Sequence, residues 1–304
     1  MSGDTYARKI QLVGGSSYAV SLPKEWIKEN NLKEKDTIRI KKTANSSLIL
    51  DVGKIQEKEI KAIKICVDKL QTKIKPLLLS LYYQGYEEIE IFTKGELTKE
   101  TRLLVRKIMT HMSGTVIEFE SNQKINMKVL LNEVNLTTVQ MLYRMSMVID
   151  LLFDNLLETH SDSEVEMNEN ELDRVYHLFN KTISLLLRQP ALLKTSGIEK
   201  MSLLPPYILL AKRLESLGDE LQALSKILFR DLEKCKNYKK DIKLLQEIFT
   251  KILNPIISTK KLNPEETGLE SKISNKLKVN NELKWILKIL EDIELEAQII
   301  YLSR

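Results

Sequence analysis

Residues 8–40 read Arg-Lys-Ile-Gln-Leu-Val-Gly-Gly-Ser-Ser-Tyr-Ala-Val-Ser-Leu-Pro-Lys-Glu-Trp-Ile-Lys-Glu-Asn-Asn-Leu-Lys-Glu-Lys-Asp-Thr-Ile-Arg-Ile. Apolar residues alternate with polar ones on both sides of Gly14-Gly15, which predicts two short half-buried strands around a glycine turn. Pro23 is well placed to begin a helix, so residues 24–30 are expected to form two helical turns that bury Trp26 and Ile27. Residues 37–40 and 48–50 are expected to pair as a hairpin across residues 43–46.

This predicted unit has the order β-β-α-β-β and spans only about fifty residues, which is too few to bury a core alone. No metal-ligand spacing or disulfide framework stabilises it, since the chain has only two cysteines, Cys66 and Cys235. We therefore expect two copies of the chain to share one core.

The same residues resemble the AbrB/SpoVT swapped-hairpin DNA-binding domain, in the form found at the N-terminus of archaeal regulators. The matching positions are Arg8-Lys9, residues 14–18, residues 20–26, and Leu32 followed by Lys35-Asp36. The family usually has glycine where Asn31 and Lys35 stand here. The resemblance implies an interlocked dimeric β-barrel over residues 1–55 that contacts double-stranded DNA. The DNA-binding residues that it implies are Arg8, Lys9, Ser16, Ser17, Tyr18 and Lys24.

The charge of this segment supports the same function independently. Residues 1–55 contain ten basic and six acidic side chains, a net of +4, while the whole chain has a formal charge of +5. A local excess of cations favours binding to a phosphate backbone, because released counterions drive the association. The alternative is a solvated basic surface without a partner.

Length and composition limit the remaining possibilities. The 304 residues leave room for two or three domains, and the low glycine and proline counts, 10 and 7, favour a mainly helical protein. No window approaches the ~18 uninterrupted apolar residues of a membrane span, and the N-terminus lacks a secretory apolar region. Two cysteines without a pairing framework fit a reducing compartment. We expect a soluble cytoplasmic protein.

Residues 56–133 are expected to form a small β-α-β-α-β module. The predicted elements are a strand around residues 63–67, a helix over 69–84 that Pro76 either kinks or starts, a strand over 88–92, a helix over 98–111 capped by Thr98, a strand over 116–119, and a further strand within 124–131. Neither Gly85 nor Gly95 belongs to a phosphate-binding glycine series. The module is therefore interpreted as structural or dimerising.

Residues 134–304 are expected to be helical. The predicted helices cover residues 136–158, 169–188, 206–229, 241–253 and 282–302, with a polar acidic loop over 160–168, a loop or short broken helix over 189–204, and a polar mobile stretch over 260–278. Leucines between Leu210 and Leu228 recur at the spacing of a bundle seam.

Three of these helices carry acids at i and i+4, namely Asp150 with Asp154, Glu169 with Asp173, and Glu215 with Asp219. Residues four apart lie one above the other on a helix, so each pair can present two carboxylates to one cation. Oxygen ligands suit magnesium, calcium, manganese or iron, and His177, one turn after Asp173, favours a transition metal, so Mg, Mn, Fe or Zn is expected. The alternative is that each pair is a solvated acidic face.

Residues 210–219 resemble the signature helix of PhoU-type phosphate-uptake regulators, whose motif is an acid, three residues, then aspartate. Residues 143–145 and 170–176 are also similar to the archaeal branch of that family, and Asp292 with Glu296 forms a degenerate second copy of the motif. The resemblance implies a helical bundle whose surface acids hold metal clusters and which regulates phosphate transport. The metal ligands that it implies are Glu215 and Asp219 first, and Glu169, Asp173, Asp150 and Asp154 less directly.

These observations together predict a mainly α chain with an N-terminal swapped-hairpin β-barrel, a small α/β middle module and a PhoU-like helical bundle. The main hypothesis is a dimeric DNA-binding regulator of phosphate uptake with a metal-binding helical sensor. The rival is an adaptor that contacts a phosphate transporter or sensor kinase and uses the barrel only to dimerise. A metal-dependent hydrolase is the third reading.

The sequence gives little support to an enzyme. The histidines are His111, His160 and His177, and no Ser-His-Asp order or zinc motif includes them. His111 falls near the end of a predicted helix and is expected to be a surface or capping residue. We therefore expect no enzymatic activity.

Overall fold

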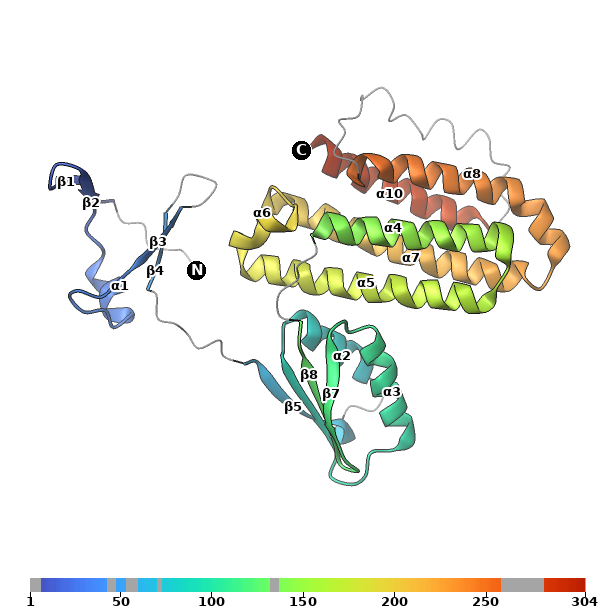
Figure 1. Ribbon diagram of the computed structural model, residues 1–304, viewed down its shortest axis with the longest axis horizontal. Helices are drawn as coiled ribbons and strands as arrows, with labels where there is room; N and C mark the ends of the chain where they lie inside the picture. The colour runs from blue at the N-terminus through green and yellow to red at the C-terminus, as the bar shows by residue number, and fades with distance from the viewer. Residues whose placement is uncertain are drawn as a thin grey trace. The chain divides into compact units, whose positions relative to one another are not determined.

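The computed structural model describes residues 7–42, 48–52, 60–69, 73–131, 137–257 and 282–303. The chain divides into two compact units, Met1–Glu59 and Ile60–Arg304, and helices make up most of the second (Figure 1). None of the described helices is both long enough and apolar enough to cross a membrane. The predicted turn at 43–46 and the stretch 260–278 lie outside the described residues.

The first unit consists of two hairpins separated by a helix. Its elements are β1 (Gln11–Val13), β2 (Ser17–Ala19), α1 (Lys24–Glu29), β3 (Arg39–Lys42) and β4 (Leu48–Asp51). Both hairpins are antiparallel. Gly14 and Gly15 connect β1 to β2 with φ of 65° and 77°, a region that side chains other than glycine rarely adopt. The predicted order β-β-α-β-β is confirmed.

The apolar side chains of this unit remain largely exposed in the single chain. No side chain among its described residues is buried, and Ile10, Leu12 and Tyr18 are 71%, 60% and 76% exposed. Trp26 and Ile27, which we expected the helix to bury, are only half-buried. The described strands form two separate two-stranded sheets, so one chain does not close a barrel.

The segment between α1 and β3 contains two residues with left-handed backbone. Asn31 has φ of 51° and Lys35 has φ of 73°. Asparagine tolerates this conformation, whereas for lysine it costs roughly 1–2 kcal/mol. These are the two positions at which the AbrB/SpoVT family, which this segment resembles, usually has glycine, and glycine adopts such a backbone without strain.

The second unit begins with the α/β module. Its elements are β5 (Ala62–Cys66), the 3-10 turn η1 (Val67–Lys69), α2 (Ile74–Tyr83), β6 (Glu88–Phe92), α3 (Lys99–Thr110), β7 (Thr115–Glu120) and β8 (Lys124–Val129). The sheet has the order β5-β6-β8-β7, in which β5 and β6 are parallel and the other pairs are antiparallel. Alternate residues of β6 and β8 are buried against α2 and α3. Thr98 caps α3 by accepting from the Thr101 N–H, as predicted.

Long helices that run side by side form the rest of the second unit (Figure 1). They are α4 (Thr138–Asp154), which continues into the π-helical turn η2 (Asn155–Thr159), α5 (Asp162–Arg188), α7 (Leu204–Leu228), α8 (Leu232–Ile257) and α10 (Lys284–Leu302). The short elements η3 (Pro190–Leu192), α6 (Leu193–Ser196) and η4 (Met201–Leu203) connect α5 to α7. One apolar core joins these helices, and α4 packs against α5, α7 and α8, while α7 contacts all four of the others.

The predicted acidic loop over residues 160–168 is wrong. His160, with φ of 53°, ends the π-helical turn, and Ser161 then caps α5 by accepting from the Glu164 N–H. Asp162 and Glu164 lie in the first turn of α5. Acids are favourable there because they interact with the helix dipole. The acidic run therefore extends the helix by about two turns.

Other helix boundaries also differ from prediction. The helix predicted over 69–84 begins at Ile74, with Pro76 in its first turn, where a missing N–H breaks no hydrogen bond. The helix predicted over 241–253 is α8, which begins at Leu232. In its first turns the buried residues are Cys235 and Tyr238, and their neighbours are mostly polar. The apolar spacing there is too sparse to predict a helix from the sequence.

The α/β module is joined to α5 by several polar contacts. The Lys181 Nζ donates to the Leu131 carbonyl (2.6 Å) and lies 4.4 Å from the centre of the Tyr82 ring. The Arg188 guanidinium donates to the carbonyls of Gln84 and Tyr83. Helix α5 therefore contacts the helical core on one side and the module on the other.

The left-handed turn provides a test of the first unit. Lys35→Gly should raise the free energy of unfolding by about 1 kcal/mol, because glycine adopts positive φ without strain. Urea unfolding, followed by Trp26 fluorescence in a Trp285→Phe background, measures the change.

Lys33→Gly is the matched control, since it removes the same charge where φ is not positive. It should lower stability by roughly 0.5–1 kcal/mol. Equal effects of the two glycines would contradict the assigned backbone conformation.

Candidate functional site

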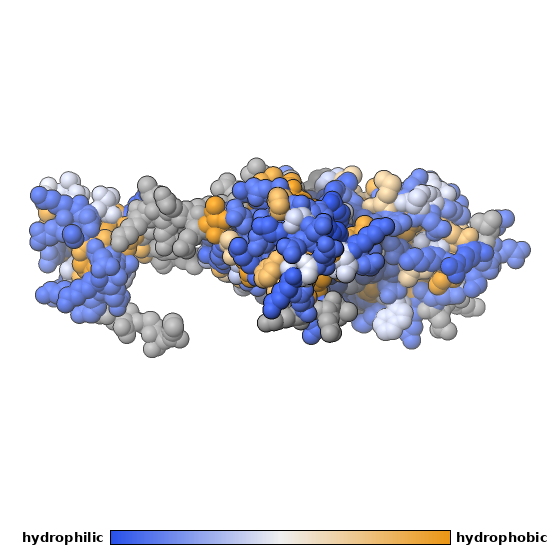
Figure 2. All heavy atoms as spheres, turned by 90° about the horizontal axis from the view of Figure 1, so that it is seen from below, coloured by the Kyte–Doolittle hydropathy of each residue, from blue (hydrophilic) through white to orange (hydrophobic). Residues whose placement is uncertain are grey.

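The predicted DNA-contacting residues all lie at the surface of the first unit. Each of the six is exposed: Arg8, Lys9, Ser16, Ser17, Tyr18 and Lys24. Serines 16 and 17 follow the glycine turn and enter β2, and Lys24 begins α1. Hydrophilic and apolar side chains lie side by side on the molecular surface (Figure 2). In a single chain, the surface of the first unit therefore carries polar side chains that can contact phosphates. It also carries apolar side chains that no core of that chain covers.

In the second unit, the packing of α5 against α7 brings two of the three predicted carboxylate pairs together. Glu169 and Asp173 lie on α5, and Glu215 and Asp219 lie on α7. A Cβ added to Gly218 would lie 2.2 Å from the Leu172 Cδ2, so the glycine is what lets Leu172 of α5 reach the α7 backbone. We call these four acids the carboxylate cluster.

The members of the carboxylate cluster repel one another. Burial, followed by the charges of Asp173 and Asp219, raises the pKa of Glu169. Burial and then Glu215 raise the pKa of Asp173, and burial, Glu215 and Asp173 raise the pKa of Asp219 to about 6. The native state therefore disfavours the ionised form of these groups, as expected for acids that lack sufficient positive charge.

Three lysines offset part of this negative charge, and one of them, Lys226 of α7, opposes the rise in the pKa of Glu169. The Lys212 ammonium pairs with the Glu215 carboxylate on the same helix. Lys75 of α2 opposes the rise in the pKa of Glu169 and of Asp173. Since these pKa values remain raised, the three cations compensate the four carboxylates only in part.

The third predicted pair lies at a different place, where α4 packs against α8. The Asp154 carboxylate accepts from the Gln246 side-chain amide (2.8 Å). Burial, followed by the charge of Asp154, raises the pKa of Asp150 to about 6. The six predicted metal ligands thus divide between two locations, four carboxylates at the α5–α7 contact and two at the α4–α8 contact.

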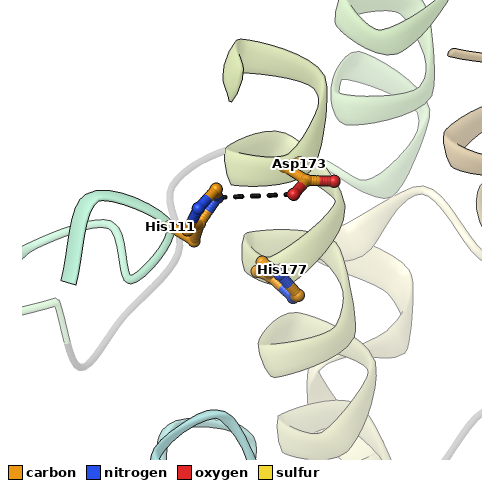
Figure 3. Close-up of side chains that lie close together, drawn as sticks. All are labelled: His111, Asp173 and His177. Carbon is orange, nitrogen blue, oxygen red and sulfur yellow. Dashed lines mark ion pairs between the residues drawn. The ribbon is translucent and has the colours of Figure 1, made fainter. Parts of the chain in front are cut away.

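Two histidines extend the carboxylate cluster toward the α/β module. The His111 Nδ1 lies 3.5 Å from an Asp173 carboxylate oxygen (Figure 3). His177, one turn after Asp173, forms a hydrogen bond through its Nδ1 with the Tyr83 hydroxyl. The ligand atoms of His111, Asp173 and His177 all lie within 4.8 Å of one another.

Both histidine rings are buried, and burial disfavours their protonated, charged form. Burial lowers the pKa of His177 to about 4, with His111 and lysines contributing further. Burial, Lys75 and Lys107 lower the pKa of His111. Both imidazoles are therefore neutral at pH 7, which is the form that binds metals.

Of the two alternatives expected for His111, a surface or a capping residue, the structure shows the second. His111 is the C-cap residue of α3, but it is only 5% exposed and does not lie at the surface. The spacing of Asp173 and His177 was visible in the sequence, whereas nothing in the sequence links His111 to α5.

Comparison with known proteins informs only the first unit. A family model described as antidote-toxin recognition MazE, bacterial antitoxin, matches residues 11–58. Comparisons with curated proteins and with solved structures found no match. The chain thus begins with a MazE/AbrB-like domain, which is consistent with a DNA-binding, dimerising regulator. The likeness of the helical part to PhoU proteins rests on its sequence motifs alone.

The carboxylate cluster makes stability depend on pH. At pH 7.5 in chelating buffer, Asp219→Asn should raise the free energy of unfolding by about 1 kcal/mol, because it removes a charge that burial and the charges of Glu215 and Asp173 disfavour, an effect that water reduces at this partly exposed residue. The folded pKa of about 6 lies above the ordinary 3.8, so the penalty is absent below pH 3.8 and complete above pH 6. The gain should therefore shrink as the pH falls from 6 to 4.

Glu247→Gln, which neutralises an exposed acid on α8, is the control and should change stability little at either pH. Thermal unfolding at pH 4.0 and 7.5 measures both variants. A gain for Asp219→Asn that is the same at the two pH values would argue against charge repulsion.

Proposed function

We propose that the protein is a dimeric DNA-binding transcription regulator of phosphate uptake. In this proposal the first unit binds double-stranded DNA, and the second unit senses phosphate status through a cation at the carboxylate cluster. The observation that carries the proposal is the MazE/AbrB-like match over residues 11–58, whose described part exposes apolar side chains such as Leu12 together with basic ones such as Lys24. In this proposal the protein regulates transcription and does not catalyse a reaction. It is located in the cytoplasm, where it can bind DNA.

Dimerisation follows from the exposed apolar side chains. Two copies of the first unit can hide Ile10, Leu12 and Val20 in a shared core, which one copy cannot do. Interlocking of the two copies would also place two sets of basic residues against one duplex. Doubling the phosphate contacts strengthens binding and steepens its dependence on salt.

The residues of the carboxylate cluster are suited to hold a hard cation. Four carboxylates from two adjacent helices, three with a raised pKa, supply oxygen ligands in a place that is short of positive charge. When bound, a cation such as Mg²⁺ or Mn²⁺ offsets that repulsion and offers open positions to phosphate oxygens. The link to phosphate rests on the resemblance of residues 210–219 to PhoU proteins.

Asp150 and Asp154 offer a smaller second site. Two carboxylates with one amide neighbour give fewer ligands than the cluster does, so we assign the sensing role to Glu169, Asp173, Glu215 and Asp219. Iron or zinc would need nitrogen ligands in addition, which only the His111 and His177 side of the cluster supplies.

DNA binding is tested with the double variant Arg8→Ala and Lys9→Ala. Removal of these cations should weaken binding to the protein's own promoter or to phosphate-transport promoters by at least about tenfold, and should reduce the salt slope by about 0.9 for each phosphate that the variant no longer neutralises. Lys239→Ala with Lys240→Ala, an exposed pair on α8, is the matched control and should bind like the wild type. Fluorescence anisotropy over a range of salt concentrations measures each affinity.

The same experiment separates the proposal from an adaptor that contacts a phosphate transporter or sensor kinase. In cells, expression of phosphate-transport genes should lose its regulation in the Arg8/Lys9 variant, whereas an adaptor would keep it. Glu215→Gln with Asp219→Asn should retain DNA binding and lose the response to phosphate. Wild-type binding no tighter than to random duplex would refute the regulator proposal.

A further inference from the structure

Three side chains capable of binding a metal meet where the α/β module contacts the helical bundle. His111 comes from the C-terminal end of α3 in the module, and Asp173 and His177 come from adjacent turns of α5 in the bundle (Figure 3). Their ligand atoms lie within 4.8 Å of one another. The group therefore exists only because the module is placed against α5.

One ring nitrogen in this group has no hydrogen-bond partner among the residues that the structure describes. The His111 side chain is 6% exposed, and its Nδ1 is buried without a hydrogen bond. An Asp173 carboxylate oxygen lies 3.5 Å from this nitrogen. Burying a polar atom without a hydrogen bond lowers the stability of the folded state by roughly 1–3 kcal/mol. A bound ligand at the His111 Nδ1 would remove that cost.

The second histidine already has the outer partner that metal ligands usually have. The His177 Nδ1 is hydrogen-bonded with the hydroxyl of Tyr83, a residue of α2 in the module. When that Nδ1 carries the proton and donates it to the tyrosine oxygen, the lone pair of Nε2 is free for a metal. The module thus supplies both one ligand and the group that orients another.

We propose that His111, Asp173 and His177 bind one divalent first-row transition metal ion, such as Zn²⁺ or Fe²⁺, which fastens the α/β module to helix α5. Two imidazoles and one carboxylate suit these ions better than Mg²⁺, which prefers oxygen ligands. Side-chain adjustments of about 1 Å would bring the ligand atoms to the ~3.3 Å separations around a tetrahedral ion at ~2.0–2.1 Å. Water completes the coordination.

The charges around the group are mixed. Lys75 and Lys212 oppose positive charge at His177, while Glu169 and Glu215 interact unfavourably with the Asp173 carboxylate. Because Asp173 belongs to both groups, a metal held by the histidines would draw this carboxylate out of the cluster. The module and the proposed sensor would then be linked through one side chain.

This site goes beyond the proposed function and does not depend on it, since neither DNA nor phosphate takes part in the binding. The test uses the full chain, stripped of metal with a chelator and titrated with Co²⁺ as a spectroscopic substitute for Zn²⁺. We expect one Co²⁺ per chain with visible absorption typical of nitrogen ligation, and no displacement by excess Mg²⁺. His111→Gln and His177→Gln should each weaken binding at least tenfold.

His160→Asn is the matched control, because it removes a histidine outside the group and keeps a residue that tolerates the left-handed backbone of that position. It should bind Co²⁺ like the wild type. Hydrogen exchange gives a second readout: Zn²⁺ should slow exchange around the end of α3 in the wild type and in His160→Asn, but not in His111→Gln. If His111→Gln does not fold, Asp173→Asn takes its place.

Absence of Co²⁺ binding by the wild type would overturn the inference, as would unchanged binding in the folded His111 and His177 variants. Either result would leave DNA binding by the first unit untouched. Conversely, a failure of the chain to bind DNA would leave the metal site standing.

Discussion

The close packing of α5 and α7 at Gly218 is the contact on which the second unit's site depends. Any Cβ at this position would collide with Leu172, which is itself buried. A glycine inside a helix costs roughly 1 kcal/mol relative to alanine, so its presence here is explained by the close approach that it permits. The same approach carries Asp173 toward Glu215 and Asp219, which flank the glycine.

The two units of the chain differ in whether they bury a hydrophobic core within a single chain. The second unit buries large side chains such as Tyr82, Phe153 and Phe249 almost completely, whereas the described part of the first unit buries none. A segment with that composition gains little from folding alone and much from a second copy. In the proposed dimer, the same association would supply a shared core and a doubled basic surface, so stability and DNA binding would depend on one another.

Local signals predicted much of this architecture. The features that the sequence identified depend only on residues within a few positions of one another. They are the Gly14-Gly15 turn, the Thr98 cap and the acids four residues apart. The failures have two causes. The acidic run after His160 was misread because the same residues suit a helix N-terminus as well as a loop. His111 was missed because its burial depends on a contact with α5 about sixty residues away, which no local pattern encodes.

The most direct test of the central claim is the mass of the full chain in solution, alone and bound to a duplex from its own promoter. Sedimentation or light scattering should find two chains per particle, and two chains on each duplex. A chain that stays monomeric at micromolar concentration, or a dimer that carries no duplex at low salt, would contradict the account.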